Sequence, residues 1–98
     1  MFTGIVEQLA KIVDIKNSKN NLDITLSSEI TSELKIDQSV SHNGICLTVV
    51  EINNKLYTVT AIEETINKTT IRSWKINDVI NLERAMKIGD RLDGHMIQ

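Results

Sequence analysis

The chain has 98 residues, of which 41% are hydrophobic, and a formal net charge of −2. That length suits one domain with a modest core, and the thin scatter of Lys and Arg excludes the continuous basic surface of a nucleic-acid-binding protein. No apolar run approaches the roughly eighteen residues of a membrane span, so we expect no membrane partner.

The single cysteine and the N-terminal residues indicate the cellular compartment in which the protein folds. One cysteine allows no intrachain disulfide, which suits a reducing environment. The start of the chain lacks the basic head and the long apolar stretch of a signal peptide. We therefore expect a cytoplasmic protein. Cys46, His42 and His95 lack the paired spacing of a metal site, so no metal is expected.

Residues 5–15 are ambiguous. Helical spacing accounts for Ile5, Leu9, Ile12 and Val13. The odd-numbered face of a strand would instead hold Ile5, Leu9, Val13 and Ile15. On periodicity alone the helix is favoured, with Thr3 as its cap.

The next segments have clearer patterns. Residues 22–27 alternate between apolar and polar side chains and predict a strand. A short helix capped by Ser28 is expected over residues 28–34. Residues 45–52 predict a strand that a two-residue Asn53-Asn54 loop of type I′ joins to a second strand over residues 56–62.

The last part of the chain predicts one helix and one strand. Residues 63–73 are polar with spaced isoleucines, which indicates a short helix. Residues 79–83 predict a strand. Several short strands in so small a chain are typical of a closed or nearly closed barrel.

The most informative motif is residues 41–49, Ser-His-Asn-Gly-Ile-Cys-Leu-Thr-Val. It contains the only cysteine and one of two histidines. An Asn-Gly turn precedes an apolar strand, an arrangement that presents polar side chains to a small ligand at the end of a strand.

Three segments in register resemble the N-terminal half of riboflavin synthase. They are residues 1–7 (MFTGIVE), residues 41–49 with Glu64-Thr65 downstream, and residues 79–85 (VINLERA) followed by 89–95 (GDRLDGH). The resemblance implies an all-β fold, a six-stranded Greek-key antiparallel barrel with one or two short helices. It also replaces the helix over residues 5–15 with a strand. Residues 1–98 would form a single barrel that corresponds to half of a two-barrel enzyme.

The family's reaction joins two molecules of 6,7-dimethyl-8-ribityllumazine. A four-carbon unit passes between them, giving riboflavin and a ribitylamino-pyrimidinedione. The family uses no metal and no cofactor, so catalysis consists mainly of holding two flat heterocycles face to face, with some acid–base assistance. With one barrel, this chain would supply one pocket and have little or no activity alone.

The resemblance also implies which residues serve the reaction. It makes Ser39, Cys46 and Phe2 the candidate catalytic residues: Ser39 and Cys46 match family positions for substrate handling, and Phe2 lies in a segment that reaches towards a partner barrel. The substrate-binding set would be Gly4, Ile5, Val6, Cys46, Leu47, Thr48, Thr60, Ala61, Ile62, Glu64 and Thr65. Hydroxyl groups suit a ring edge and a ribityl chain because they both donate and accept hydrogen bonds.

Three other interpretations stay open. Cys46 could be a small buried hydrophobic residue, His42 a turn residue or a structural histidine, and His95 a residue of the domain junction. Relatives of the family also bind lumazine or flavin without catalysis, as optical antennae. For assembly, a lone barrel is expected to form a homodimer, and a full-length two-barrel chain a trimer.

Overall fold

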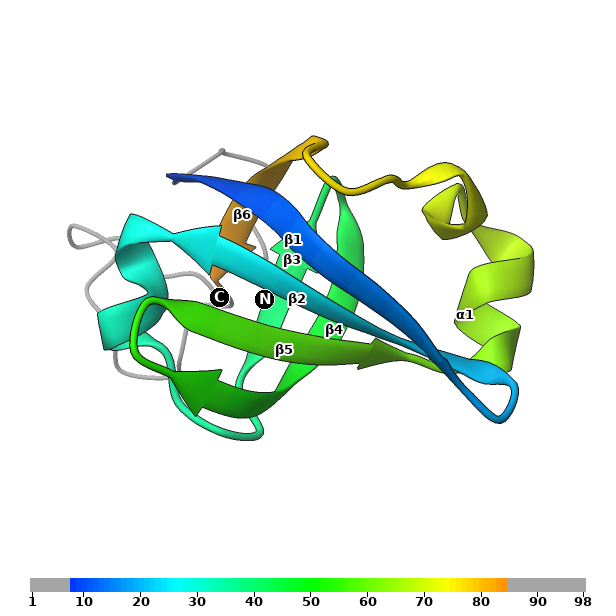
Figure 1. Cartoon of the computed structure of the whole chain (residues 1–98), viewed down its shortest axis with the longest axis horizontal. Helices are drawn as coiled ribbons and strands as arrows, with labels where there is room; N and C mark the ends of the chain where they lie inside the picture. The colour runs from blue at the N-terminus through cyan, green and yellow to red at the C-terminus, as the bar shows by residue number, and fades with distance from the viewer. Residues whose placement is uncertain (1–7, 85–98) are drawn as a thin grey trace, which may run out of the picture.

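The computed structural model describes residues 8–84. They form a closed antiparallel barrel with short helices at its two ends (Figure 1). The elements in chain order are β1 (Gln8–Ser18), β2 (Asn21–Ser28), the 3₁₀ helix η1 (Glu29–Glu33), β3 (Ser39–His42), β4 (Ile45–Asn53), β5 (Leu56–Ala61), α1 (Glu63–Lys68), the 3₁₀ helix η2 (Ile71–Ser73) and β6 (Val79–Arg84). The all-β barrel predicted from the sequence is confirmed.

The strand order around the barrel is β1-β2-β5-β4-β3-β6. The consecutive strands β3, β4 and β5 pair as hairpins, and β2 returns beside β5. On the other side, β6 closes the barrel between β3 and β1. The strands β2–β5 and the strands β3–β6 each have the Greek-key order, and closure leaves no free sheet edge in the described barrel.

The interior of the barrel is mainly aliphatic. Strand residues alternate, so every second side chain points inward, and the fully buried strand residues include Ile12, Ile24, Leu26, Val49 and Val59. The β-branched composition favours strands because such side chains pack well on a pleated surface.

Residues 8–18 form a strand, so the helix that periodicity favoured is wrong. The inward face also differs from the odd-numbered one, because Ala10 and Ile12 are buried whereas Leu9 and Val13 are exposed. A shift of register between Ile12 and Asp14 changes the alternation, so that Ile15 returns to the core. A bulge of this kind cannot be read from spacing alone.

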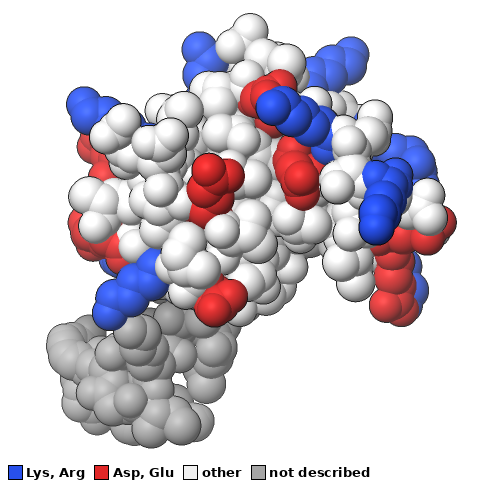
Figure 2. Space-filling view, turned by 60° about the horizontal axis from the view of Figure 1, so that its bottom comes forward, with Lys and Arg blue, Asp and Glu red and all other residues white. Residues whose placement is uncertain are grey.

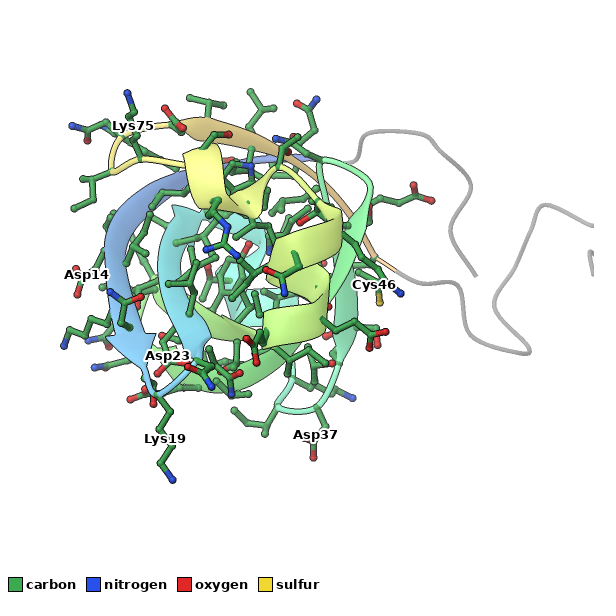
Figure 3. The ribbon with its side chains drawn as sticks, turned by 90° about the vertical axis from the view of Figure 1, so that its right-hand side faces the viewer. Asp14, Lys19, Asp23, Asp37, Cys46 and Lys75 are labelled. Atoms are coloured by element: carbon green, nitrogen blue, oxygen red, sulfur yellow. The ribbon has the colours of Figure 1, made fainter. Side chains whose placement is uncertain are left out.

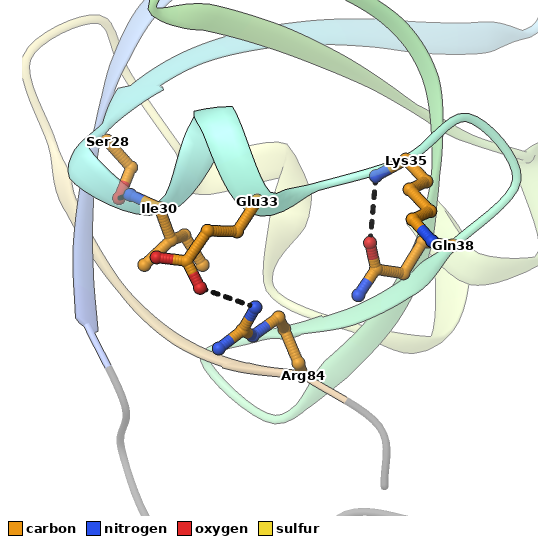
Figure 4. Close-up of polar contacts among 6 residues, drawn as sticks. All are labelled: Ser28, Ile30, Glu33, Lys35, Gln38 and Arg84. Atoms are coloured by element: carbon orange, nitrogen blue, oxygen red, sulfur yellow. Dashed lines mark hydrogen bonds and ion pairs between the residues drawn. The ribbon is translucent and has the colours of Figure 1, made fainter. Parts of the chain in front are cut away.

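The short helix η1 follows β2 as the sequence predicted. Ser28 caps it, accepting a hydrogen bond from the Ile30 amide (Figure 4). The Ser28 hydroxyl also donates to the Leu9 carbonyl at 2.7 Å, which ties the cap to β1. Arg84 at the end of β6 reaches Glu33 at 3.1 Å, so η1 is also linked to the closing strand (Figure 4).

The helix predicted over residues 63–73 is divided in two. Thr69 ends α1 in an extended conformation, and its hydroxyl donates to the Thr65 carbonyl. The Ile71 amide then bonds to the Thr69 hydroxyl, which starts η2. Side-chain hydroxyls that bond to nearby backbone compete with continued helix.

Two-residue turns connect the hairpins. Asn43 and Gly44 both have positive φ, of 54° and 86°, as a type I′ turn requires. The turn after β4 is Asn54-Lys55, one residue later than predicted, and only Asn54 has positive φ there. The predicted type I′ turn at Asn53-Asn54 is therefore wrong.

Candidate binding face

Polar side chains from four neighbouring strands form one row on the outer wall of the barrel. Ser39 lies opposite Thr48, Thr48 opposite Thr60, and Thr60 opposite Asp23. Directly opposed residues share a face of the sheet, and the alternate residues on these strands are buried. We call Ser39, Thr48, Thr60 and Asp23 the hydroxyl row. Three inter-strand spacings make it about 14 Å long.

Cys46 lies two residues before Thr48 on β4, next to this row on the same face of the sheet. It is exposed and pairs with Ser41 of β3. Figure 3 shows its side chain pointing away from the barrel, with Asp23 farther around the wall. The interpretation of Cys46 as a buried core residue is therefore wrong, because its thiol faces outward.

The other predicted binding residues lie at different depths. Leu47 and Ala61 point into the core, so only their backbone faces the outer wall. Ile62 is 51% exposed and directly precedes α1. Within α1, Glu64 forms an ion pair with Lys68 at 3.0 Å, and Thr65 is half-buried. Thus exposed apolar surface and polar groups lie at the α1 end of β5.

Several predicted residues lie outside residues 8–84. They are Phe2, Gly4, Ile5, Val6 and His95. Their expected roles stay predictions.

His42 does not belong to the outer wall. Its side chain is fully buried, Nδ1 lies 2.9 Å from the Val40 carbonyl, and Nε2 lies 2.9 Å from the Tyr57 hydroxyl. A carbonyl only accepts, so Nδ1 carries the proton and Nε2 accepts from Tyr57. Burial lowers the pKa of His42 to about 4, against the opposing effect of the Val40 hydrogen bond. The imidazole is a neutral structural group.

Tyr57 is the matching donor inside the barrel. Burial raises the pKa of its hydroxyl above the ordinary value, so it keeps its proton. Its ring centroid lies 5.8 Å from that of His42. Sequence reasoning did not single out Tyr57, although its place in the alternating pattern of β5 made it an inward residue.

Two hollows of the described surface lie away from the hydroxyl row. One, of about 400 Å³, lies at the α1 end and includes Ile66, Arg72 and Trp74 in its lining. Another, of about 740 Å³, lies beside η1 and is lined in part by Leu9 and Lys55. Neither is lined by Cys46, Thr48 or Thr60. The hydroxyl row therefore lines neither of these two hollows.

Charge on the described surface is mixed. Figure 2 shows acidic and basic side chains scattered over one face without a continuous patch of either sign. Among residues 8–84, no cluster of three or more His, Cys, Asp or Glu side chains could hold a metal ion. The described helices include none with the length and apolar character needed to cross a membrane.

Residues 3–85 match the model of the lumazine binding domain. The chain belongs to this family. A riboflavin synthase from Buchnera aphidicola subsp. Schizaphis graminum is 41% identical over 99 residues, which cover 99% of this chain and 48% of the relative. The riboflavin synthase of Escherichia coli is 38% identical, and the match covers 46% of its length. The chain therefore spans about half the length of these relatives.

Solved structures agree with this assignment. The structure of LumP in complex with 6,7-dimethyl-8-(1'-D-ribityl) lumazine is 28% identical, with a TM-score of 0.82 over 94% of this chain and 52% of LumP. The riboflavin complex of LumP gives a TM-score of 0.83, again at 28% identity, over 94% of this chain and 50% of LumP. The lumazine-binding barrel is therefore the fold of this chain.

Proposed function

We propose that this chain is one lumazine- and flavin-binding barrel of the riboflavin synthase reaction. The outer wall at the hydroxyl row, Cys46 and Ile62 would bind 6,7-dimethyl-8-ribityllumazine or riboflavin. The observation that carries this proposal is that Ser39, Thr48 and Thr60, separate in the sequence, share one row on the outer wall beside the exposed Cys46. The riboflavin synthase relatives support the reaction, and the LumP complexes support the ligands.

The chemistry of the wall suits a flat heterocycle with a polar chain. Exposed Ile62 offers apolar area to a ring face, and the hydroxyls of Ser39 and Thr48 can donate to or accept from ring heteroatoms. Ser39, Cys46 and Phe2 stay candidate catalytic residues. The reaction consumes two substrate molecules, so a barrel with one binding wall would bind substrate but have little turnover alone.

A riboflavin titration followed by ligand fluorescence tests the proposal. We expect saturable quenching at about one ligand per barrel, together with little riboflavin formation from the lumazine. Absence of binding would contradict the proposed site, and turnover like that of a two-barrel enzyme would contradict the expected dependence on a second barrel.

Thr48→Val tests the binding site without changing the stability of the fold. Both residues are β-branched, so the exposed position keeps its strand preference. Loss of one hydroxyl should weaken riboflavin binding about fivefold, or about 1 kcal/mol, with the thermal midpoint of unfolding unchanged. Thr70→Val, at an exposed position outside the wall, is the control. Unchanged affinity in the Thr48 variant would show that the wall is misplaced.

The LumP matches favour a second candidate function, a non-catalytic antenna that carries a bound lumazine or flavin. Both functions require the same wall, so binding alone does not separate them. The two functions are distinguished by an assay of riboflavin formation after this chain is mixed with a barrel that supplies the second site. Restored turnover supports the enzyme, whereas tight binding without turnover supports the antenna.

A further inference from the structure

The last member of the hydroxyl row, Asp23, belongs to the proposed wall but has no individual role in the preceding assignments. Thr60 Oγ1 donates its hydroxyl proton to Asp23 Oδ1 at 2.8 Å. The two residues are directly opposed on β2 and β5, and both are half-buried. A hydroxyl has one proton, so Thr60 keeps only lone pairs for a ligand.

This pair therefore presents acceptors to a ligand. The Asp23 carboxylate has further lone pairs beyond the one that Thr60 occupies, and it has no proton to donate. A ligand group that binds here must supply hydrogen-bond donors. A chain of adjacent hydroxyls meets that requirement, as in the recognition of ribose hydroxyls by an acidic side chain.

The neighbouring positions on the wall differ from this pair. One step along the same two strands, the Thr25 and Thr58 hydroxyls lie 3.0 Å apart and bond to each other. Lys16 lies opposite Asp23 on β1, but its Nζ lies 3.8 Å from Asp14 Oδ2. Of these two adjacent pairs on β2 and β5, only Thr60 and Asp23 join a hydroxyl to a carboxylate, at the end of the row farthest from Ser39.

We infer that Asp23 is a positioning and specificity residue for the polyol chain of the ligand. It holds the Thr60 hydroxyl as an acceptor and, with it, binds the ribityl hydroxyls, so that the heterocycle lies towards Thr48 and Cys46. This inference rests on the proposed function, because it assumes that the outer wall binds a ribityl-bearing heterocycle.

Paired titrations with riboflavin and lumiflavin test the inference. Lumiflavin carries a methyl group where riboflavin carries the ribityl chain, so the ratio of the two Kd values reports on polyol recognition. Asp23→Asn keeps the size of the side chain and replaces one acceptor oxygen with a donor group. We expect it to weaken riboflavin binding roughly tenfold and to leave lumiflavin binding unchanged, so that the preference for riboflavin collapses.

Two further variants sharpen the test. Glu29→Gln removes an equal charge just beyond the other end of β2, about 20 Å away along the strand, and should leave both Kd values unchanged. Thr60→Val should lower riboflavin affinity, and the double variant with Asp23→Asn should lose much less than the sum of the single losses, because Asp23 acts partly through Thr60. Additive losses would overturn that coupling.

The outcomes distinguish the inference from the proposed function. An equal loss for both flavins in Asp23→Asn, or no loss for either, would overturn the polyol role while the binding wall stands. If the unmodified chain binds neither flavin, the proposed function fails and the inference fails with it. Circular dichroism of each variant establishes that the barrel is folded.

Discussion

At the scale of single residues, His42 and Tyr57 form a polar pair inside an aliphatic barrel. Each would be costly to bury without a partner. The Tyr57 hydroxyl donates to Nε2 of His42, and Nδ1 of His42 donates to the Val40 carbonyl. No buried side-chain nitrogen or oxygen among the described residues lacks a hydrogen-bond partner. The pair therefore fixes the orientation of β3 relative to β5, and burying its polar groups costs little free energy because each has a hydrogen-bond partner.

The His42 imidazole gives the barrel a pH-dependent stability. Burial lowers its pKa from the ordinary 6.5 to about 4, so between these values the unfolded chain binds a proton that the folded chain does not. The free energy of unfolding should therefore fall as pH falls from about 6.5 to about 4, by about 3 kcal/mol from this group. Above pH 6.5 the contribution is complete.

Nuclear magnetic resonance of the His42 ring checks this prediction directly. The ring nitrogens should keep the shifts of the neutral Nδ1–H form down to about pH 5, and urea unfolding should show the parallel decline in stability. A titration midpoint near 6.5 would mean that the imidazole is not held as a neutral group.

Single residues also show what sequence reasoning could find of the site. Cys46 and Thr48 were named because a family motif contains them, and Ser39 because it matches a family position. The structure brings all three to one wall with Thr60. Asp23 was missed because its significance comes from its pairing with Thr60, 37 positions away in the chain. A hydrogen bond between distant strands has no signal in the local sequence.

At the scale of elements, the Asn43-Gly44 turn holds β3 in place. The Asn43 amide bonds to the Asn81 carbonyl, and the Asn43 side chain accepts from the Asn81 amide, both at 2.8 Å. The turn thus joins the β3–β4 hairpin to β6, where the barrel closes. Positive φ at both turn positions is what an Asn-Gly sequence supplies.

Replacing Gly44 should destabilise the barrel through backbone strain alone. Gly44 has φ of 86°, and an added Cβ would meet nothing within 4 Å. Gly44→Ala should therefore cost about 1–2 kcal/mol, whereas Gly44→Asn should cost less because Asn tolerates left-handed backbone. Urea unfolding compares the two, and an alanine variant no less stable than the asparagine variant would argue against strain.

The elements differ in how well their sequences predicted them. The alternation of residues 22–27 and the apolar stretch over residues 45–52 were sufficient to predict β2 and β4. The four-residue strand β3 was not predicted, because its serines and its histidine are not typical of a strand, and its place depends on pairing with β4 and β6. The break after α1 depends on the Thr69 hydroxyl, a local competition that isoleucine spacing does not reveal.

At the scale of the whole molecule, residues 8–84 form one closed barrel, and the proposed binding wall lies on its outer surface. Its curated relatives are about twice as long. A flat heterocycle on an outer wall has one ring face against protein and the other exposed. A second barrel over that face would bury it, and a copy of this chain related by a twofold axis could provide that barrel.

We therefore predict a dimer that riboflavin stabilises, because a ligand held between two copies binds the dimer in preference to the monomer. Val50 is 45% exposed, at the bulge of β4 and two residues from Thr48. Val50→Glu would place like charges near each other across a twofold interface, so sedimentation equilibrium should show a monomer even with riboflavin. Ile76→Glu, at a position 53% exposed outside the wall, should stay dimeric. A monomer for the unmodified chain at high concentration with riboflavin would contradict the pairing, and equal dissociation of both variants would place the interface elsewhere.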